Sequence, residues 1–446
     1  MLPQNERQRI IGLIKREVVP AIGCTEPIAV ALCTARATEL LGCIPEKISL
    51  QLSANILKNA MGVGIPGTGM IGLPIAIALG ALIGKSEYQL EVLRDCTPEA
   101  VECGKRFMDE GRIDITLKKS ISEKLYIEVL CEAEGRQAEA IIATGHTNFV
   151  YLRKGEKVLV DKRQIETLTK RCDADSRQPV NPSTEQDIPL TLRKVFDFAT
   201  TAPLEEIDFI LEARRLNKAA AEESFKMDYG HGLGRAIREP METPVVGDSI
   251  FAHILAYTSG ACDARMAGAM IPVMSNSGSG NQGISATMPV VIYAEETHKS
   301  EEQMVRALIL SHLTVIYIKQ SLGRLSALCG CVVAATGSSC GITYLMGGTY
   351  EQVAYAVKNM IANITGMICD GAKPSCAMKV TSGVATAVFS ALLAMQQKCV
   401  TSCEGIIDDD VDQCIRNLTR IGSQGMNETD RLVLDIMTHK GNPDNC

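Results

Sequence analysis

The fold class of the first part of the chain follows from LYIEVLCEAEGRQAEAIIATGHTNFVYLRKGEKVLV, residues 125–160. Apolar and polar residues alternate along it, a pattern typical of strands with one buried face. Turn signals at Glu134-Gly135 and Lys154-Gly155 separate the alternating runs and predict hairpins. Together with RIDITLKK, residues 112–119, these runs predict an antiparallel meander.

Helix signals precede this predicted sheet. NERQRIIGLIKREVV, residues 5–19, predicts an amphipathic helix. CTEPIAVALCTARATELLG, residues 24–42, predicts a second helix with Thr25 as its N-cap and Gly42 after its last turn. Residues 61–84 carry no charge but contain two prolines and seven glycines. We therefore expect a glycine-rich loop there, running into a buried helix too short to cross a membrane.

A polar segment, CDADSRQPVNPSTEQD at residues 172–187, is the best candidate for a linker. After it, strand patterns nearly vanish, and the long segments have helical periodicity or composition. The chain is therefore predicted to be α+β. A mixed helix and antiparallel-sheet domain covers residues 1–171, and an all-α domain covers residues 188–446.

Composition excludes several classes of protein. Hydrophobic residues make up 46% and charged residues 22%, as in a folded globular chain. A net charge of −7, the scarcity of aromatic residues and the absence of Trp argue against nucleic-acid binding. The first residues, MLPQNERQRI, show no secretory signal. We therefore expect a cytoplasmic protein with reduced thiols.

Two short segments bring together four of the 17 cysteines. They are Cys329-x-Cys331 in LCGC, and Cys369 and Cys376 at the ends of CDGAKPSC. Thiolates on short irregular segments suit an iron–sulfur cluster. The spacing matches neither four-cysteine ferredoxin pattern, so buried structural thiols are an alternative. Zinc is the rival metal, although closed zinc sites prefer CxxC pairs.

Cys24, in PAIGCTEP, lies at the start of the predicted helix over residues 24–42. Backbone N–H groups at a helix N-terminus favour a thiolate and would lower the pKa of its thiol. Glu26 opposes this by placing a negative charge nearby. From the residues alone, Cys24 is either a reactive thiol or a residue next to the helix cap that has no chemical role.

Two glycine-rich segments are candidates for anion binding. KNAMGVGIPGTG, residues 58–69, and SNSGSGNQG, residues 275–283, have the composition of loops that present N–H groups to a carboxylate or phosphate. Neither has the Gly-Lys-Ser/Thr of a P-loop, and a packing role is equally compatible with both. His146, in ATGHTN at residues 143–148, lies among small polar residues and is either structural or catalytic.

Six segments together resemble the L-cysteine desulfidase family, whose members are similar to the iron–sulfur L-serine dehydratases. They are PAIGCTEPIA, KNAMGVGIPGTG, ATGHTN, SNSGSGNQG, RLSALCGCVVAATG and CDGAKPSCAMK. The resemblance runs over nearly the whole chain. It implies a [4Fe-4S] cluster held by three cysteines, with one iron open. It also implies pyridoxal-phosphate-independent breakdown of L-cysteine to hydrogen sulfide, ammonia and pyruvate.

By motif match, the resemblance implies Cys24 as the proton acceptor. It implies Cys369, Cys376 and Cys329 as cluster ligands, with Cys331 as the alternative to Cys329. An open iron is a Lewis acid that would bind the leaving group and the carboxylate. The expected substrate-binding residues are Asn59, Gly67, Thr68, His146, Ser275, Ser277, Gly278 and Asn281.

The expected partner is a small amino acid, and neither nucleic acid nor a membrane is expected. No residue separates L-cysteine from L-serine, so an L-serine dehydratase is the alternative activity. A non-catalytic amino-acid-binding protein is a further alternative. Whether the chain forms a homo-oligomer, and whether Cys446 reaches the open iron as a fourth ligand, are left open.

Overall fold

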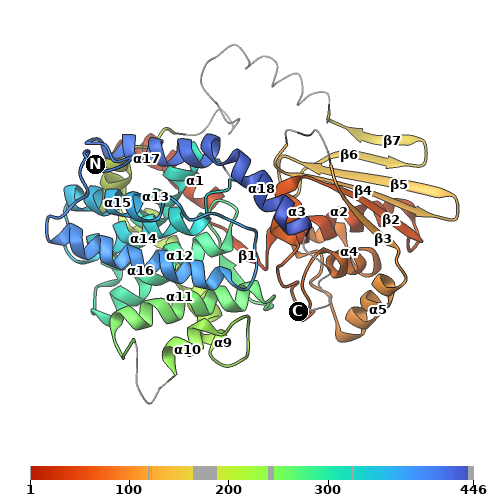
Figure 1. The fold of residues 1–446 in the computed structure, drawn as a ribbon, viewed down its shortest axis with the longest axis horizontal. Helices are drawn as coiled ribbons and strands as arrows, with labels where there is room; N and C mark the ends of the chain where they lie inside the picture. The colour runs from red at the N-terminus through yellow and green to blue at the C-terminus, as the bar shows by residue number, and fades with distance from the viewer. Residues whose placement is uncertain are drawn as a thin grey trace, which may run out of the picture.

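The computed structural model places an α/β lobe beside a helical lobe along the long axis of the molecule (Figure 1). The α/β lobe runs from α2 to β7, and the helical lobe contains most of the elements from α7 onward. The structure describes residues 2–118, 121, 123–163, 188–239, 246–323 and 326–439. The predicted linker at 172–187 and Cys446 lie outside the described residues.

A six-stranded sheet forms one layer of the α/β lobe, in the order β3-β2-β4-β5-β6-β7. Its strands are β2 (Lys47–Leu52), β3 (Ile113–Leu117), β4 (Tyr126–Ala133), β5 (Arg136–Ala143), β6 (Phe149–Lys154) and β7 (Lys157–Asp161). The predicted turn at Glu134-Gly135 joins β4 to β5, and both of its residues have positive φ, as a tight hairpin requires. The turn after Lys154 joins β6 to β7. The antiparallel meander is thus confirmed for β4–β7.

The edge strand β3 differs from the prediction, because it pairs with β2 in parallel rather than in the antiparallel meander. Parallel neighbours need a long crossover, which helices provide between β2 and β3. The crossover contains α3 (Ala54–Ala60), α4 (Leu73–Leu82), the 3-10 helix Ser86–Glu91 and α5 (Pro98–Asp109). The sheet is therefore mixed.

Helices cover one face of this sheet. Helix α2 (Thr25–Leu41) packs on β4 and β5, and α4 packs on α2. The predicted buried helix after the glycine-rich loop is confirmed as α4. Gly42 ends α2 with a φ of 85°, but Cys24 rather than Thr25 is the N-cap residue. The Cys24 thiol is therefore carried at the first turn of α2, at the side of the lobe nearest the helical lobe.

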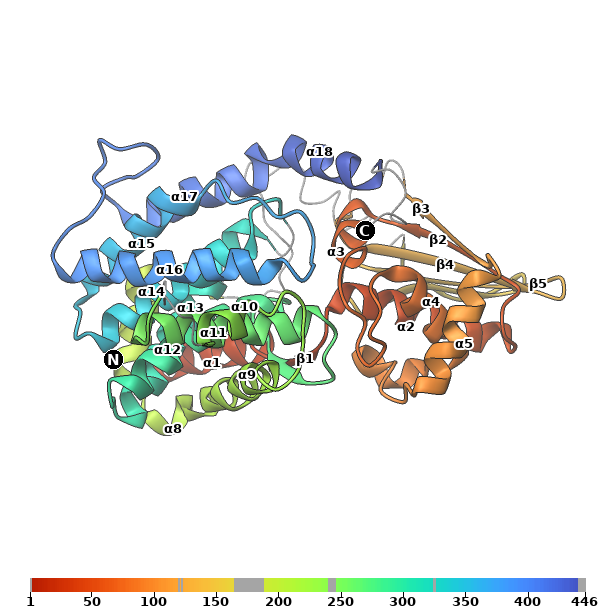
Figure 2. The same cartoon turned by 60° about the horizontal axis from the view of Figure 1, so that its bottom comes forward.

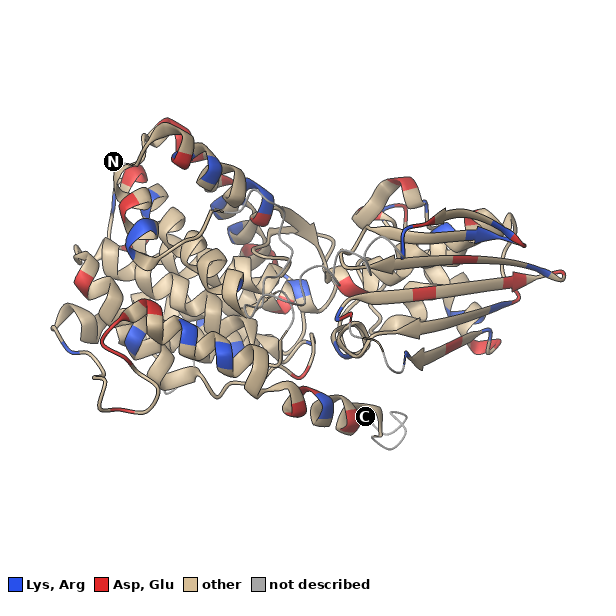
Figure 3. Ribbon diagram, turned by 90° about the horizontal axis from the view of Figure 1, so that it is seen from above, with Lys and Arg blue, Asp and Glu red and all other residues tan. Residues whose placement is uncertain are grey.

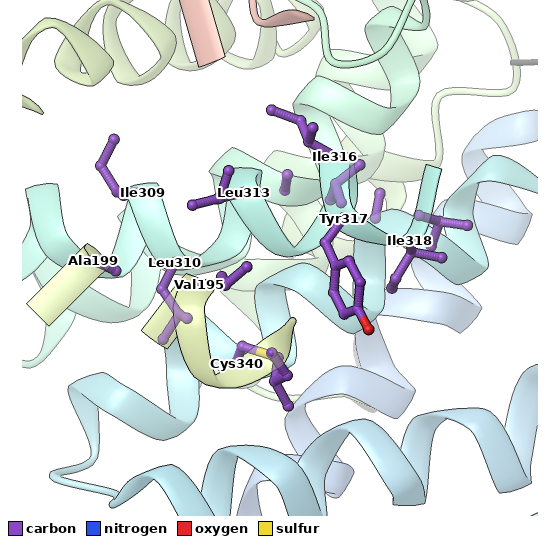
Figure 4. Close-up of a cluster of buried hydrophobic side chains, with 14 of the residues drawn as sticks. Val195, Ala199, Ile309, Leu310, Leu313, Ile316, Tyr317, Ile318 and Cys340 are labelled. Carbon is purple, nitrogen blue, oxygen red and sulfur yellow. The ribbon is translucent and has the colours of Figure 1, made fainter. Parts of the chain in front are cut away.

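The helical lobe is built around long, almost fully buried helices. Its helices are α7 (Leu192–Thr201), α8 (Leu204–Ile207), α9 (Leu211–Ser224), α10 (Leu233–Arg238), α11 (Ile250–Met266), α12 (Gly280–Glu296), α13 (Glu301–Leu322), α14 (Gly330–Leu345), α15 (Tyr350–Ile364), α16 (Cys376–Met395), α17 (Val411–Arg420) and α18 (Asn427–Thr438). Side chains of α7, α13 and α14 meet in its core, among them Val195, Leu310 and Cys340 (Figure 4). Charged residues are concentrated on the outer helices and on the sheet, and the central helices carry few (Figure 3). The prediction of a helical second half is confirmed.

The two ends of the chain cross between the lobes. Helix α1 (Gln4–Glu17) packs in the core of the helical lobe, and β1 (Pro20–Ile22) pairs with β8 (Pro272–Met274). At the other end, α18 reaches across to α3 (Figure 2). The domain limits at residues 171 and 188 stay a prediction, but α1 packs with the helical lobe although it precedes the sheet in sequence.

Among the described residues, α16 is long and apolar enough to span a membrane by length and composition. Half of that stretch is buried inside the protein, and core helices of soluble proteins pass the same test. This feature is therefore weak support for a membrane span.

Candidate functional site

A cavity of about 130 Å³ lies where the two lobes meet. Pockets for drug-sized ligands measure roughly 300–1,000 Å³, so this one suits a much smaller molecule. Its lining comes from α2, α3, α11, α12, α13, α14, α16 and the loops before them. The lining residues that matter below are Cys24, Glu26, Asn59, Arg265, Ser277, Gly278, Ser279, Asn281, Gln282, Lys319, Cys329, Cys331, Cys369, Cys376 and Lys379.

The two cysteine segments reach this cavity side by side because their backbones pair. Leu328 and Ile368 form an isolated β-bridge. The Cys369 N–H donates to the Ala327 carbonyl oxygen at 2.6 Å, and the Cys329 N–H donates to the Met367 carbonyl oxygen at 3.0 Å. Residues about forty positions apart are thereby held together, and each segment brings thiols to the same cavity.

The segment from Cys369 to Cys376 is also held against the α/β lobe. Gly371 has a φ of +92°, and a Cβ there would lie 2.2 Å from the Lys58 carbonyl oxygen of α3. Only glycine fits this close approach of two backbones. The Lys58 ammonium donates to the Cys369 carbonyl oxygen at 3.4 Å. The cysteine loop is therefore positioned by both lobes.

Among the thiols of LCGC, Cys329 is the one more easily deprotonated. A hydrogen bond from the neighbouring Cys331 thiol lowers the pKa of Cys329 to about 7, and the charges of Lys379 and Lys373 act in the same direction. Cys329 is also the N-cap of α14, where helix N–H groups favour a thiolate. Cys331 faces the Met367 sulfur at 3.1 Å, and its own pKa is raised well above the ordinary value.

Burial raises the pKa values of the other two candidate ligands, to about 11 for Cys369. Cationic side chains offset this cost around the loop. Lys373 forms an ion pair with Asp370 at 2.5 Å, and Lys379 pairs with the same carboxylate. Nearby ammonium groups stabilise thiolates, and thiolates are the form in which cysteines bind a cluster.

Within the described parts of the chain, no three His, Cys, Asp or Glu side chains gather closely enough to ligate a single metal ion. This geometry does not favour the zinc alternative, which needs four ligands around one ion. An iron–sulfur cluster places each cysteine on a different iron, so its ligands are spread more widely. The cysteines of the cavity fit a cluster better than a mononuclear site.

Cys24 and Glu26 form a hydrogen-bonded pair in the wall of the same cavity. The Cys24 thiol donates to Glu26 Oε2 at 3.0 Å, and Asn59 Nδ2 donates to Glu26 Oε1 at 3.3 Å. Burial, followed by the charge of Glu26, raises the pKa of Cys24 well above its ordinary value. Of the two opposing effects seen in the sequence, the charge of Glu26 therefore outweighs the helix N-terminus at this thiol.

Four of the predicted substrate-binding residues line the cavity: Asn59, Ser277, Gly278 and Asn281. The loop that carries three of them is held by a buried polar network. Asn276 Nδ2 contacts His312 Nδ1 at 3.0 Å, and Thr287 Oγ1 contacts His312 Nε2 at 2.9 Å. Ser277, Gly278 and Asn281 of this glycine–serine segment thus line the cavity, and their binding of a substrate stays a prediction.

The other four predicted residues do not line the cavity, because local contacts use their polar groups. Ser275 Oγ donates to the Val19 carbonyl oxygen at 2.6 Å, and Thr68 Oγ1 donates to that of Ile65 at 2.7 Å. The Gly67 N–H donates to the Gly268 carbonyl oxygen at 3.2 Å. His146 lies in the turn between β5 and β6.

Sequence reasoning missed Arg265, Lys319 and Lys379 as lining residues. Arg265 lies in the last turn of α11 and is 4% exposed. A signal was present in CDARMAG, residues 262–268, because a cation in an otherwise apolar helix needs a buried anion or a functional reason.

Comparison with known proteins matches residues 87–435 to the serine dehydratase alpha chain family. The chain is 72% identical over 440 residues to a UPF0597 protein of Bacteroides fragilis, covering 99% of this chain and 100% of that protein. It is 71% identical over 438 residues to a UPF0597 protein of Bacteroides thetaiotaomicron, covering 98% and 99%. A UPF0597 protein of Porphyromonas gingivalis is 57% identical over 436 residues, again covering 98% and 99%. The chain therefore belongs to the UPF0597 protein family and contains a serine dehydratase alpha chain domain.

Proposed function

We propose that this protein is an iron–sulfur lyase that β-eliminates sulfide from L-cysteine, in agreement with the resemblance to the L-cysteine desulfidases. The observation that carries the proposal is the meeting of Cys329, Cys369 and Cys376 with Cys24 in one small cavity. Enzymes of the serine dehydratase alpha chain family use an iron–sulfur cluster. We propose Cys329, Cys369 and Cys376 as the ligands of the cluster.

When bound, the cluster supplies a Lewis acid at an iron without a protein thiolate. The chain's own residues handle the α-proton. Glu26 Oε2 takes the proton of the Cys24 thiol along their 3.0 Å hydrogen bond, and the resulting thiolate takes the α-proton of the substrate. Loss of the β-sulfur as hydrogen sulfide leaves aminoacrylate, which water converts to pyruvate and ammonia.

L-Serine is the second candidate substrate, and the match to the serine dehydratase alpha chain family favours it. The two substrates differ only in the leaving atom, sulfur or oxygen. The same proton transfers at Cys24 and Glu26 would serve both, with water as the leaving group from serine. In the cytoplasm, the location we propose, the thiols of the site would stay reduced.

Anaerobic reconstitution with iron and sulfide tests the proposal directly. Brown protein that releases pyruvate from L-cysteine or L-serine supports it, and the ratio of kcat/KM for the two identifies the substrate. Protein that takes up no iron contradicts it. Loaded protein that binds an amino acid without turnover is instead the non-catalytic binding protein.

A matched pair of variants tests the third ligand. We expect Cys329→Ser to prevent stable cluster loading, and Cys331→Ser to retain the iron content and visible spectrum of the wild type. We expect this difference because Cys329 has the more acidic thiol, whereas the Cys331 thiol faces the Met367 sulfur. The reverse pattern would exchange the two assignments.

A further inference from the structure

Arg265 is a buried cation of the cavity with no acidic partner among the described residues. No carboxylate oxygen of the described residues lies within 4.0 Å of its guanidinium nitrogens. Its Nη1 donates to Asn281 Oδ1 at 3.0 Å and has a longer contact with the Met266 sulfur. Its Nε is buried without a hydrogen-bond partner. A guanidinium removed from water in this way is costly unless an anion joins it.

The surroundings of Arg265 keep space for the guanidinium and favour an anion. A Cβ at position 280 would lie 2.1 Å from Arg265 Nε, so Gly280 leaves the space that the side chain occupies. Gly280 also begins α12, a helix of 17 residues, whose first N–H groups and dipole favour negative charge. Asn281 accepts from one side of the guanidinium and so orients it.

A guanidinium is well suited to bind a carboxylate. The Nη2 of Arg265 has no acceptor among the described residues, whereas its Nε is enclosed next to Gly280. Arg265 and Cys24 line the same cavity, and the charge of Arg265 acts on the Cys24 thiol. An anion at Arg265 therefore lies near the proposed proton acceptor.

We propose that Arg265 binds the α-carboxylate of the amino-acid substrate through Nη2, with Asn281 orienting the guanidinium. This assignment rests on the proposed function and deepens it by defining the substrate class. The protein acts on free α-amino acids, and the decarboxylated analogues of its substrates are excluded. The carboxylate is held by a side chain as well as, or instead of, an iron.

Ligand binding to anaerobically loaded Cys24→Ala protein, which lacks the proposed proton acceptor and should not turn its substrate over, tests this. Isothermal titration compares L-serine with ethanolamine, and L-cysteine with cysteamine, which lack only the carboxylate. We expect the loss of the carboxylate to weaken binding about 10–100-fold, as expected for charge-assisted hydrogen bonds. Equal affinities within each pair would overturn the assignment.

Arg265→Gln and Arg265→Lys then identify the cation. We expect Arg265→Gln to raise the Kd of L-serine by about 10–100-fold and leave that of ethanolamine unchanged, with Arg265→Lys between the two. Arg215→Gln, at a side chain that is 67% exposed, is the matched control. Iron content and the visible spectrum show that each variant is loaded. An unchanged Kd for L-serine in loaded Arg265→Gln would overturn the assignment.

The outcomes separate this inference from the proposed function. If binding depends on the carboxylate but the loaded wild type releases no pyruvate, the carboxylate site stands and the lyase proposal fails. If wild-type protein turns over its substrate and Arg265→Gln keeps the same KM, the lyase stands and the Arg265 assignment fails.

Discussion

Lys58 of α3 and Asp430 of α18 form an ion pair that joins the two lobes beside the cysteine loop. The side chain of Lys58 is 2% exposed, and its ammonium also donates to the Cys369 carbonyl oxygen. One buried cation therefore connects a helix near the end of the chain, a helix of the α/β lobe and the backbone of a proposed ligand.

Replacing Asp430 with Asn should destabilise the protein, because it leaves the buried ammonium of Lys58 without its counterion. Breaking a buried pair costs about 3 kcal/mol of unfolding free energy. Asp95→Asn, which disturbs the exposed pair with Lys85, should cost much less, because solvent screens an exposed pair. Urea unfolding measures both. Equal losses would show that the interlobe pair contributes no more than a surface pair.

Glu26→Gln should lower the pKa of Cys24. The charge of Glu26 and its hydrogen bond both raise that pKa, and an uncharged amide removes the repulsion of a thiolate. The pH profile of Cys24 alkylation by iodoacetamide, read by peptide mass spectrometry, should shift to lower pH. Glu46→Gln, at an exposed site, is the control. A profile that does not move would remove Glu26 as the partner of the thiol.

Asp263 should make the stability of the protein depend on pH. It is 1% exposed, and burial raises its pKa to about 6 from the ordinary 3.8. A raised folded-state pKa means that its stabilising contribution is full below about pH 4 and is lost as the pH rises through about 6. The unfolding free energy of Asp263→Asn, relative to that of the wild type, should therefore rise by about 3 kcal/mol between pH 4 and pH 7.

Denaturant unfolding of the wild type and Asp263→Asn at several pH values measures this difference. Asn keeps an oxygen that accepts from the Gly234 N–H, as Asp263 Oδ2 does at 3.1 Å. Asp114→Asn, at an exposed residue of β3, provides the baseline. A stability difference that stays constant from pH 4 to pH 7 would contradict the raised pKa.

His312→Phe should loosen the loop that carries Ser277 and Gly278. It removes one buried hydrogen bond from Asn276 and one from Thr287, at about 0.5–1.5 kcal/mol for each bond. Burial lowers the pKa of His312 to about 3, so the imidazole is neutral in the folded protein. The stability it contributes is present above about pH 6.5 and is lost as the pH falls toward 3.

The difference in unfolding free energy between the wild type and His312→Phe should therefore shrink as the pH falls below about 6.5. The affinity of the loaded protein for L-serine should also fall, because the loop no longer holds its position. His298→Asn is the control, since His298 is exposed and Asn tolerates its φ of 53°. An unchanged affinity would show that this network does not position the loop.

Much of the fold could be predicted because its signals are local. The alternation in β4–β7, the turn at Glu134-Gly135 and the end of α2 at Gly42 each depend on a few neighbouring residues. The parallel pairing of β3 and the packing of α1 in the helical lobe were not predicted. They depend on which distant surfaces bury each other, which periodicity along the chain does not report.

The candidate site divides in the same way. The sequence determined the residue types, since the cysteine segments, the glycine–serine loop and Cys24 before α2 are visible as motifs. The tertiary structure decided which of them meet, placing Asn59 and Asn281 in the cavity while Gly67, Thr68, Ser275 and His146 lie outside its lining. It also placed Arg265 in the same cavity as Cys24, as a cation with no acidic partner among the described residues. Chemistry follows from side-chain type, but burial and the lack of a partner arise only when elements hundreds of residues apart pack together.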